Sequence, residues 1–321
     1  MLSEFDLITK YFTKPITNAS LGIGDDCALL MPTPGTQMAI STDMLVSGTH
    51  FFPDTDPRQL GHKSLAVNLS DLAAMGAEPV AFTLALALPT VDEIWLKPFS
   101  EGMFSLAGFH RCELIGGDTT KGPLNICITV FGQIPFGQAI RRDKAQHGYD
   151  IWVSGIIGDA RLALAHCRKE TVLDEDEFQK VLPRLQMPMP RIALGIALRK
   201  IASAALDLSD GLLGDLTHIL DASKVGATLN IDAFPISPIL ARQPEKCRLL
   251  CALGGGDDYE LCFTAPVSKR GRVLEASAKT GIPVTRIGFI ENEPGLRLRN
   301  NEGELQSFSC RSFDHFLQTE K

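Results

Sequence analysis

The sequence predicts a mixed α/β (α+β) protein built from two domains. Its 321 residues are enough for two domains, each with its own hydrophobic core. Strand-like apolar runs alternate with helical segments in both halves of the chain. Acidic residues beside glycine, serine or threonine recur where predicted strands end, which is where open α/β sheets place ligands. These observations predict a ligand site built on two sheets.

The first half contains the signals of a mixed unit of helices and strands. Apolar residues at helical spacing mark its helices, an Asp-Pro pair marks a helix start, and short apolar or alternating runs mark its strands. The predicted elements are a short helix at 5–12, a strand at 36–46, a helix at 57–76, a strand at 80–88, a helix at 92–110, a short strand ending at 118 and a strand at 124–133.

A polar stretch at 137–148 marks the predicted domain boundary. We therefore expect domains at 1–138 and 139–321. The second half repeats the alternation, with strands expected at 149–154, 204–208, 228–231, 259–264 and 284–289, and helices at 190–201 and 212–222.

The composition narrows the classes of partner. A formal net charge of −7 argues against a nucleic-acid surface, because phosphate backbones require clustered Lys and Arg. The eight cysteines lack a second pair at zinc-ligand spacing, so we interpret them as reduced thiols. The longest apolar run, 80–88, is far shorter than a membrane span, and no charged start precedes an apolar N-terminal segment. We expect a cytoplasmic protein that binds neither nucleic acid nor membrane.

Six acidic motifs are the most informative feature of the chain. They are Gly24-Asp25-Asp26, Ser41-Thr42-Asp43, Ser70-Asp71, Gly117-Asp118, Asp207-Leu208-Ser209-Asp210 and Gly256-Asp257-Asp258. Oxygen ligands suit Mg²⁺, which usually binds through one or two carboxylates together with water and phosphate oxygens. So many carboxylates therefore predict several magnesium ions and a polyphosphate.

Each motif also has a simpler structural interpretation. Paired aspartates after a glycine are common in turns, and Ser209 or Asp210 could cap a helix. Asp71 is harder to explain in this way, because its helix is apolar on nearly every side and an isolated carboxylate there is costly. Asp207 is not explained by capping either. The phosphate-binding loop of P-loop enzymes and the catalytic loop of protein kinases are both missing from the sequence.

Six ordered blocks carry a resemblance to a known family. They are Leu21 to Leu30 (LGIGDDCALL), Ile40 to Phe51 (ISTDMLVSGTHF), Ala66 to Ala77 (AVNLSDLAAMGA), Ile115 to Thr120 (IGGDTT), Leu206 to Leu212 (LDLSDGL) and Gly255 to Phe263 (GGDDYELCF). Over nearly its whole length the chain resembles the thiamine-monophosphate kinase family, a branch of the aminoimidazole ribonucleotide synthetase superfamily. The resemblance implies an N-terminal mixed-sheet domain that binds ATP and Mg²⁺ and forms a dimer barrel, and a C-terminal α/β domain that completes the active site.

The resemblance also implies an activity and a set of site residues. ATP would donate its γ-phosphate to thiamine monophosphate by direct in-line transfer, with Mg²⁺, and the partner protein would be a second copy of the chain. Magnesium ligands would be Asp26, Ser41, Thr42, Asp43, Asp71, Asp118, Asp207 and Asp210, of which Asp71, Asp118 and Asp210 are the catalytic candidates. Gly117, Asp118, Arg142 and Ser209 would contact ATP, and His50, Asp257 and Phe313 would contact the acceptor.

Some of these residues have other interpretations or depart from the family pattern. Arg142 could belong to a solvated basic linker beside Arg141, His50 could be a surface histidine, and Phe313 could be a core residue. Asp257 stands where the family usually has glutamate. Two further functions stay open: another ATP-using enzyme of the superfamily with a different acceptor, or a non-catalytic protein that binds nucleotide or thiamine phosphate.

Overall fold

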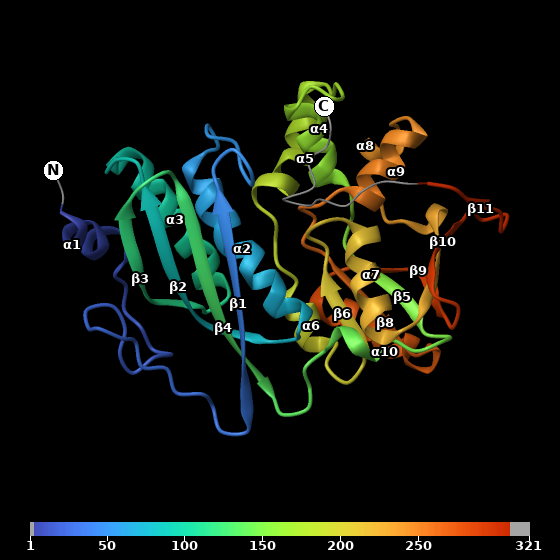
Figure 1. Cartoon of the computed structure of the whole chain (residues 1–321), viewed down its shortest axis with the longest axis horizontal. Coiled ribbons are helices and arrows are strands. Elements are labelled where there is room, and N and C mark those ends of the chain that lie inside the picture. Colours follow the sequence, from blue (N-terminus) through green and yellow to red (C-terminus); the bar gives the residue numbers. More distant parts are fainter. Residues whose placement is uncertain (1–2, 309–321) are drawn as a thin grey trace. The chain divides into compact units, whose positions relative to one another are not determined.

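The computed structural model describes residues 3–308 and consists of two compact units (Figure 1). Unit 1 comprises residues 1–72 and 77–139, and unit 2 comprises residues 73–76 and 140–321. Each unit contains one sheet with its own helices.

Unit 1 contains a four-stranded mixed sheet in the order β1-β4-β2-β3. Its strands are β1 (Thr36–Val46), β2 (Glu78–Leu88), β3 (Glu113–Lys121) and β4 (Asn125–Pro135). Strand β4 runs antiparallel to β1 and β2, whereas β2 and β3 are parallel. These strands match the sequence predictions closely, except that β3 continues three residues past the predicted end at Asp118.

Two helices, α2 (Pro57–Ala74) and α3 (Glu93–Phe109), lie behind the sheet of unit 1 in Figure 1. Asp56 caps the start of α2 as predicted, since its carboxylate accepts a hydrogen bond from the Gln59 backbone N–H at 3.0 Å.

Alternate residues of β4, including Ile126 and Ile128, are fully buried. On β1, Ile40 and Met44 are instead 62% and 54% exposed. A short α1 (Glu4–Leu7) and a π-helical turn (Ile8–Phe12) open the chain.

Unit 2 contains a seven-stranded sheet in the order β11-β10-β7-β9-β5-β8-β6. The strands are β5 (Asp150–Ser154), β6 (Ala204–Asp207), β7 (Gly226–Asn230), β8 (Leu261–Ala265), β9 (Val284–Glu291), β10 (Gly295–Arg299) and β11 (Leu305–Gln306). Among the described strands of this seven-stranded sheet, only β7 and β10 pair in parallel. The predicted strand at 259–264 begins instead at Leu261, because Tyr259 has a φ of 50°, which no strand residue adopts.

The helices of unit 2 are α4 (Asp159–Cys167), α5 (Glu175–Gln186), α6 (Ile192–Ala197), α7 (Leu212–Ser223), α8 (Pro238–Ala241), α9 (Glu245–Gly254) and α10 (Arg270–Thr280). Leu212, Leu216 and Ile219 of α7 are buried in one core with Ile151 of β5 and Leu206 of β6. Helix α6 is shorter than the predicted 190–201. Between residues 3 and 308, no helix is both long and apolar enough to cross a membrane.

Candidate active site

Strand β1 and helix α2 bring four polar residues of unit 1 together. The Ser41 hydroxyl donates a hydrogen bond to the Asp71 carboxylate. Asp43 follows Ser41 by two residues on β1, and its backbone N–H donates to the Asn68 side-chain oxygen at 2.9 Å. Asn68 is fully buried and donates in turn to the Ser64 carbonyl on α2 at 3.0 Å. Ser41, Asp43 and Asp71 therefore lie on facing elements, and the half-buried Asp71 on α2 has a polar partner on β1.

Thr42 points to the other face of β1, because successive side chains of a strand alternate. Its side chain is exposed, and its hydroxyl oxygen lies 2.8 Å from that of Thr129 on β4. The Thr42 hydroxyl is thus directed away from the face that carries Ser41 and Asp43. Its assignment as a magnesium ligand remains a prediction that the side-chain direction does not support.

Gly117 and Asp118 lie in β3 beside Leu84 and Ala85 of β2. Gly117 has a φ of 150°, and a Cβ atom there would lie 1.8 Å from the Leu84 carbonyl oxygen. The close approach of two strands therefore requires this glycine, independently of any phosphate. The Asp118 side chain is exposed.

Asp26 and His50 lie in turns of unit 1. Asp26 follows Asp25, whose carboxylate accepts the Asp26 backbone N–H at 2.8 Å, and both side chains are exposed. The local turn interpretation thus holds for Asp25. Nδ1 of His50 accepts the Val46 backbone N–H at 3.0 Å, which places the proton of a neutral ring on Nε2.

In unit 2, two loops distant in sequence pair through their backbones. The Ser209 carbonyl accepts the Asp257 N–H at 3.0 Å, and the Leu208 carbonyl accepts the Tyr259 N–H at 2.8 Å. Gly256 permits this approach, since a Cβ there would lie 2.2 Å from the Ser209 carbonyl oxygen. The structure therefore brings the motif at 207–210 together with Asp257.

Asp215 is a residue of this region that the sequence analysis missed. It is 4% exposed on α7, and its Oδ2 accepts the backbone N–H groups of Asp210 at 3.1 Å and Gly211 at 3.0 Å. Burial, together with the negative charge of Asp210, raises the pKa of Asp215 to about 7. An aspartate among leucines in the first turn of a helix was the available signal, because such a residue caps the backbone that precedes it.

Arg142 begins a 3₁₀ turn, Arg142–Lys144, in unit 2. The neighbouring Arg141 is engaged locally, with hydrogen bonds of 3.0 and 2.6 Å to Asp143. The Arg142 backbone is fixed through its carbonyl, which accepts a hydrogen bond from the Ser223 hydroxyl at 2.8 Å.

Phe313, the third residue predicted to contact the acceptor, lies outside the described residues.

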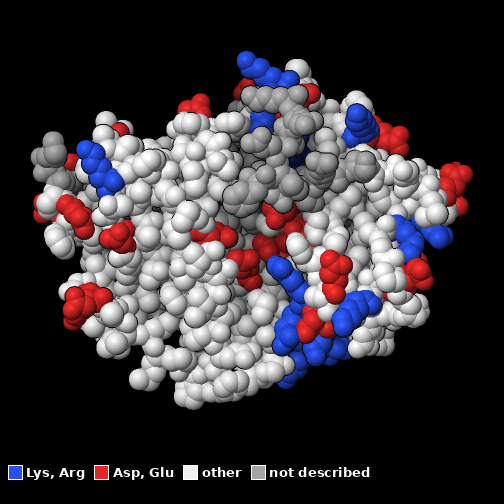
Figure 2. Space-filling view, in the orientation of Figure 1, with Lys and Arg blue, Asp and Glu red and all other residues white. Residues whose placement is uncertain are grey.

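The charges of the visible surface are mixed. On the face shown in Figure 2, most atoms are uncharged, and the Lys and Arg groups lie among Asp and Glu. Within residues 3–308, no three or more His, Cys, Asp or Glu side chains form a cluster suited to enclose a metal ion. Mg²⁺ does not require such a cluster, because it usually takes one or two carboxylates and completes its octahedron with water and phosphate oxygens. The carboxylate and hydroxyl donors found here fit that ion.

Comparison with known proteins decides the family. Residues 24–134 match the AIR synthase related protein, N-terminal domain, and residues 148–300 match the corresponding C-terminal domain. The thiamine-monophosphate kinase of Salmonella typhimurium is 46% identical over 319 residues, which cover 98% of both chains. The chain belongs to the thiamine-monophosphate kinase family. The resemblance drawn from the six sequence blocks is thereby confirmed.

Solved structures of thiamine-monophosphate kinases have the same fold. The enzyme from Stenotrophomonas maltophilia K279a has a TM-score of 0.84 at 46% identity and covers 90% of this chain and 92% of its own. AaThiL complexed with AMPPCP and TMP has a TM-score of 0.78 at 27% identity, and 89% of each chain is covered. The predicted mixed α/β fold of the thiamine-monophosphate kinases is confirmed.

Proposed function

We infer that this chain phosphorylates thiamine monophosphate to thiamine diphosphate, with ATP as the phosphoryl donor. The observation that carries this inference is the 46% identity to a thiamine-monophosphate kinase over 98% of both chains. A related structure holds AMPPCP and TMP together, which are an ATP analogue and the proposed acceptor. The acidic motifs of the family are present in this chain on both units.

The proposed reaction is a direct transfer. An oxygen of the acceptor phosphate forms a bond to the γ-phosphorus of ATP, the bond from that phosphorus to the β–γ bridging oxygen breaks, and ADP leaves. Such a reaction depends on positioning and on neutralising charge, and it does not require a covalent enzyme intermediate. The chain would therefore act mainly by holding both phosphate groups in line.

The residues proposed to hold magnesium lie on both units. Those of unit 1 are Asp26, Ser41, Asp43, Asp71 and Asp118, with Thr42 as the member whose hydroxyl faces away from Ser41 and Asp43, and those of unit 2 are Asp207 and Asp210. Bound Mg²⁺ would neutralise phosphate charge. Two like charges brought to about 4 Å repel by about 4 kcal/mol at intermediate dielectric, so carboxylates beside bound phosphates would need such compensation.

Further residues are proposed to bind the two substrates. Gly117 and Asp118 of unit 1 and Arg142 and Ser209 of unit 2 would contact ATP. A guanidinium such as that of Arg142 suits phosphate oxygens, because its planar donors can bind two oxygens at once. His50, Asp257 and Phe313 would contact the acceptor.

A coupled ADP-release assay tests the function. Purified protein with ATP and Mg²⁺ is given thiamine monophosphate, free thiamine or aminoimidazole precursors, and the product is identified by mass. We expect thiamine diphosphate from the monophosphate alone. ADP release with another acceptor would instead indicate a different enzyme of the superfamily, and ATP binding without release would indicate a binding protein.

We also propose that the chain forms a homodimer through the open face of the sheet in unit 1. Ile40 and Met44 are exposed on this face, and they pair in register with Phe131 and Cys127 of β4. Exposed apolar side chains grouped on a sheet favour association. In addition, β1 is an edge strand, and natural proteins usually cover such edges.

A further inference from the structure

The loop from Gly255 to Glu260 has an unusual backbone. Asp257 has a φ of 66° and Tyr259 a φ of 50°, both in the left-handed region that residues other than glycine rarely adopt. Such residues persist only where the surrounding structure holds them. Both side chains are half-buried, whereas the alternate residues Asp258 and Glu260 are buried. The side chains and backbone groups around this loop must therefore hold it in this conformation.

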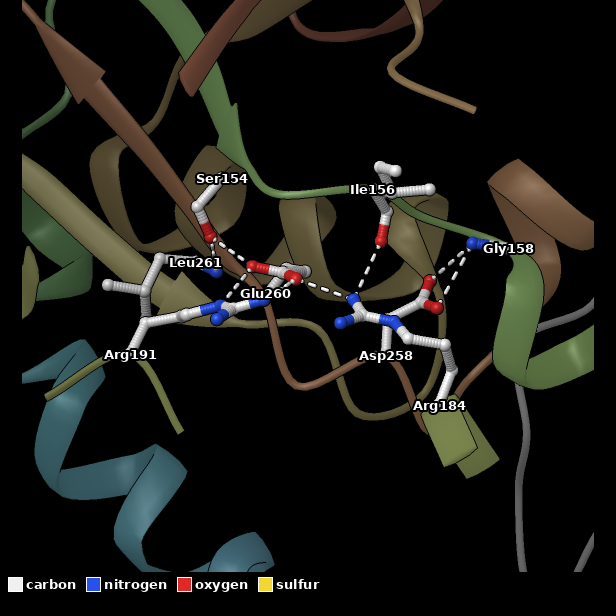
Figure 3. Close-up of polar contacts among 8 residues, drawn as sticks. All are labelled: Ser154, Ile156, Gly158, Arg184, Arg191, Asp258, Glu260 and Leu261. Atoms are coloured by element: carbon white, nitrogen blue, oxygen red, sulfur yellow. Dashed lines mark hydrogen bonds and ion pairs between the residues drawn. The ribbon is translucent and has the colours of Figure 1, made fainter. Parts of the chain in front are cut away.

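Glu260 lies at the centre of a buried polar network (Figure 3). Its side chain is fully buried, and Arg184 and Arg191 approach it from opposite sides. Arg184 donates to Oε1 at 2.6 Å, and Arg191 donates through Nε to Oε2 at 2.7 Å and through Nη2 to Oε1. The Ser154 hydroxyl at the end of β5 also donates to Oε2, at 2.6 Å.

Asp258 is held by the loop between β5 and α4. Both its oxygens accept the Gly158 backbone N–H, at 3.0 and 2.9 Å. Arg184, which donates to Glu260, also donates to the Ile156 carbonyl of this loop at 3.0 Å. Gly155 packs directly against the Glu260 side chain, because a Cβ atom on Gly155 would lie only 2.1 Å from Oε1 of Glu260. Asp258 and Glu260 are thus anchored on both sides of Tyr259.

The network does not serve stability alone. Burying ion pairs costs desolvation free energy, and apolar residues of similar volume often stabilise a fold equally well or better. What this network does provide is a defined direction for the chain at 258 and 260. Tyr259 and Asp257 alternate with these anchors and are half-buried, and the Tyr259 hydroxyl donates to Asp257 Oδ1 at 3.2 Å.

We propose that Glu260, with Arg184, Arg191 and Asp258, positions Asp257 and Tyr259 to recognise the thiamine moiety of the acceptor. Tyr259 orients the Asp257 carboxylate, which is one methylene shorter than the usual glutamate of the family. This inference rests on the proposed function, in which Asp257 contacts the acceptor. Glu260 is a positioning residue, because it acts through Asp257 and does not touch the substrate.

Three variants test the proposal. Glu260→Gln keeps the shape of the side chain but removes the charge that holds both arginines. Tyr259→Phe removes only the hydroxyl that orients Asp257. Asp150→Asn is the matched control, because Asp150 is also a buried carboxylate of unit 2 paired with two arginines, Arg270 and Arg286, at the opposite end of β5.

The measurements are KM for thiamine monophosphate, KM for ATP, kcat and the melting temperature. We expect Glu260→Gln to raise KM for the acceptor about tenfold or more and to leave KM for ATP unchanged. The reason is that charged hydrogen bonds to the arginines are lost, and this loss reaches the acceptor through Asp257. Tyr259→Phe should raise the same KM severalfold without lowering the melting temperature. Asp150→Asn should lower the melting temperature and leave both KM values unchanged.

An unchanged acceptor KM in folded Glu260→Gln, or equal rises in both KM values, would overturn the proposal. If Glu260→Gln does not fold, Tyr259→Phe decides, and an unchanged acceptor KM in that variant would reject the inference. Wild-type protein that does not phosphorylate thiamine monophosphate would reject the proposed function itself. The two failures are therefore distinguishable.

Discussion

At the scale of single residues, Asp71 is a half-buried carboxylate on α2. Its partner Ser41 donates a hydrogen bond to it, which asparagine can still accept. Asp71→Asn therefore removes a negative charge with little change in packing. We expect turnover to fall by more than about a hundredfold, as for loss of a group that stabilises a transition state, while the melting temperature stays near that of the wild type.

The ADP-release assay and thermal unfolding check this prediction, with the exposed Asp54→Asn as the control for loss of one charge. Full activity in folded Asp71→Asn would remove Asp71 from the site.

Titration of His110 should make the stability of the folded protein depend on pH. Its Nε2 is buried and has no hydrogen-bond partner among the described residues, and burial lowers the pKa of His110 to about 4. The unfolded chain takes up a proton on this ring below about pH 6.5, whereas the folded chain does so only near its lowered pKa. The free energy of unfolding should therefore fall as the pH drops from about 6.5 toward 4.

For this half-buried ring, solvent screening reduces the expected loss between about pH 7 and pH 5 to about 1 kcal/mol. Urea unfolding of wild type, His110→Gln and the exposed control His218→Gln at both pH values measures it. His110→Gln should lose less stability on acidification than the other two. Equal losses in all three proteins would show that His110 does not contribute.

At the scale of elements, glycines set the distance between α2 and α3. A Cβ on Gly61 would lie 2.0 Å from the Phe99 carbonyl oxygen, and one on Gly102 would lie 1.9 Å from that of Arg58. Each helix thus presents a glycine to the backbone of the other. The same contact would be impossible with alanine at either position.

We expect Gly102→Ala to lower the free energy of unfolding by about 1–3 kcal/mol or more, because the helices must move apart. Gly108→Ala lies on the same helix with nothing within 4 Å of the added Cβ, and it should be neutral or stabilising by up to about 1 kcal/mol. Chemical unfolding compares the two. Similar effects in both variants would mean that helix propensity, and not the contact, explains the change.

At the scale of the whole molecule, the open sheet face of unit 1 predicts the oligomeric state. Combining Ile40→Glu with Met44→Glu places two charges on this face, and they would be buried in the proposed homodimer. Ile94→Glu on α3 is the control, since Ile94 is 86% exposed and lies outside the sheet.

Light scattering after size exclusion should show a dimer for the wild type and the control, and a monomer for the double variant. A monomeric wild type would contradict the proposed homodimer.

Much of the fold followed from local patterns. The strands of unit 1 were predicted closely, because alternation and apolar runs report burial on a sheet directly. Asp56 marked the start of α2, because an aspartate at that position can accept a hydrogen bond from a backbone N–H of the first turn. The start of β8 was predicted two residues early, because the left-handed conformation of Tyr259 has no signal in a sequence that otherwise continues as a strand.

The sequence by itself determined the family, the acidic motifs and the mixed α/β class, because these depend on residue types and on local periodicity. Only the tertiary structure decided that Ser41 meets Asp71 while Thr42 faces the other way, that Asp215 holds the backbone before α7, and that Glu260 is fixed by two arginines. The physical reason is that hydrogen bonds and ion pairs between residues distant in sequence depend on strand register and helix packing, which local patterns do not specify.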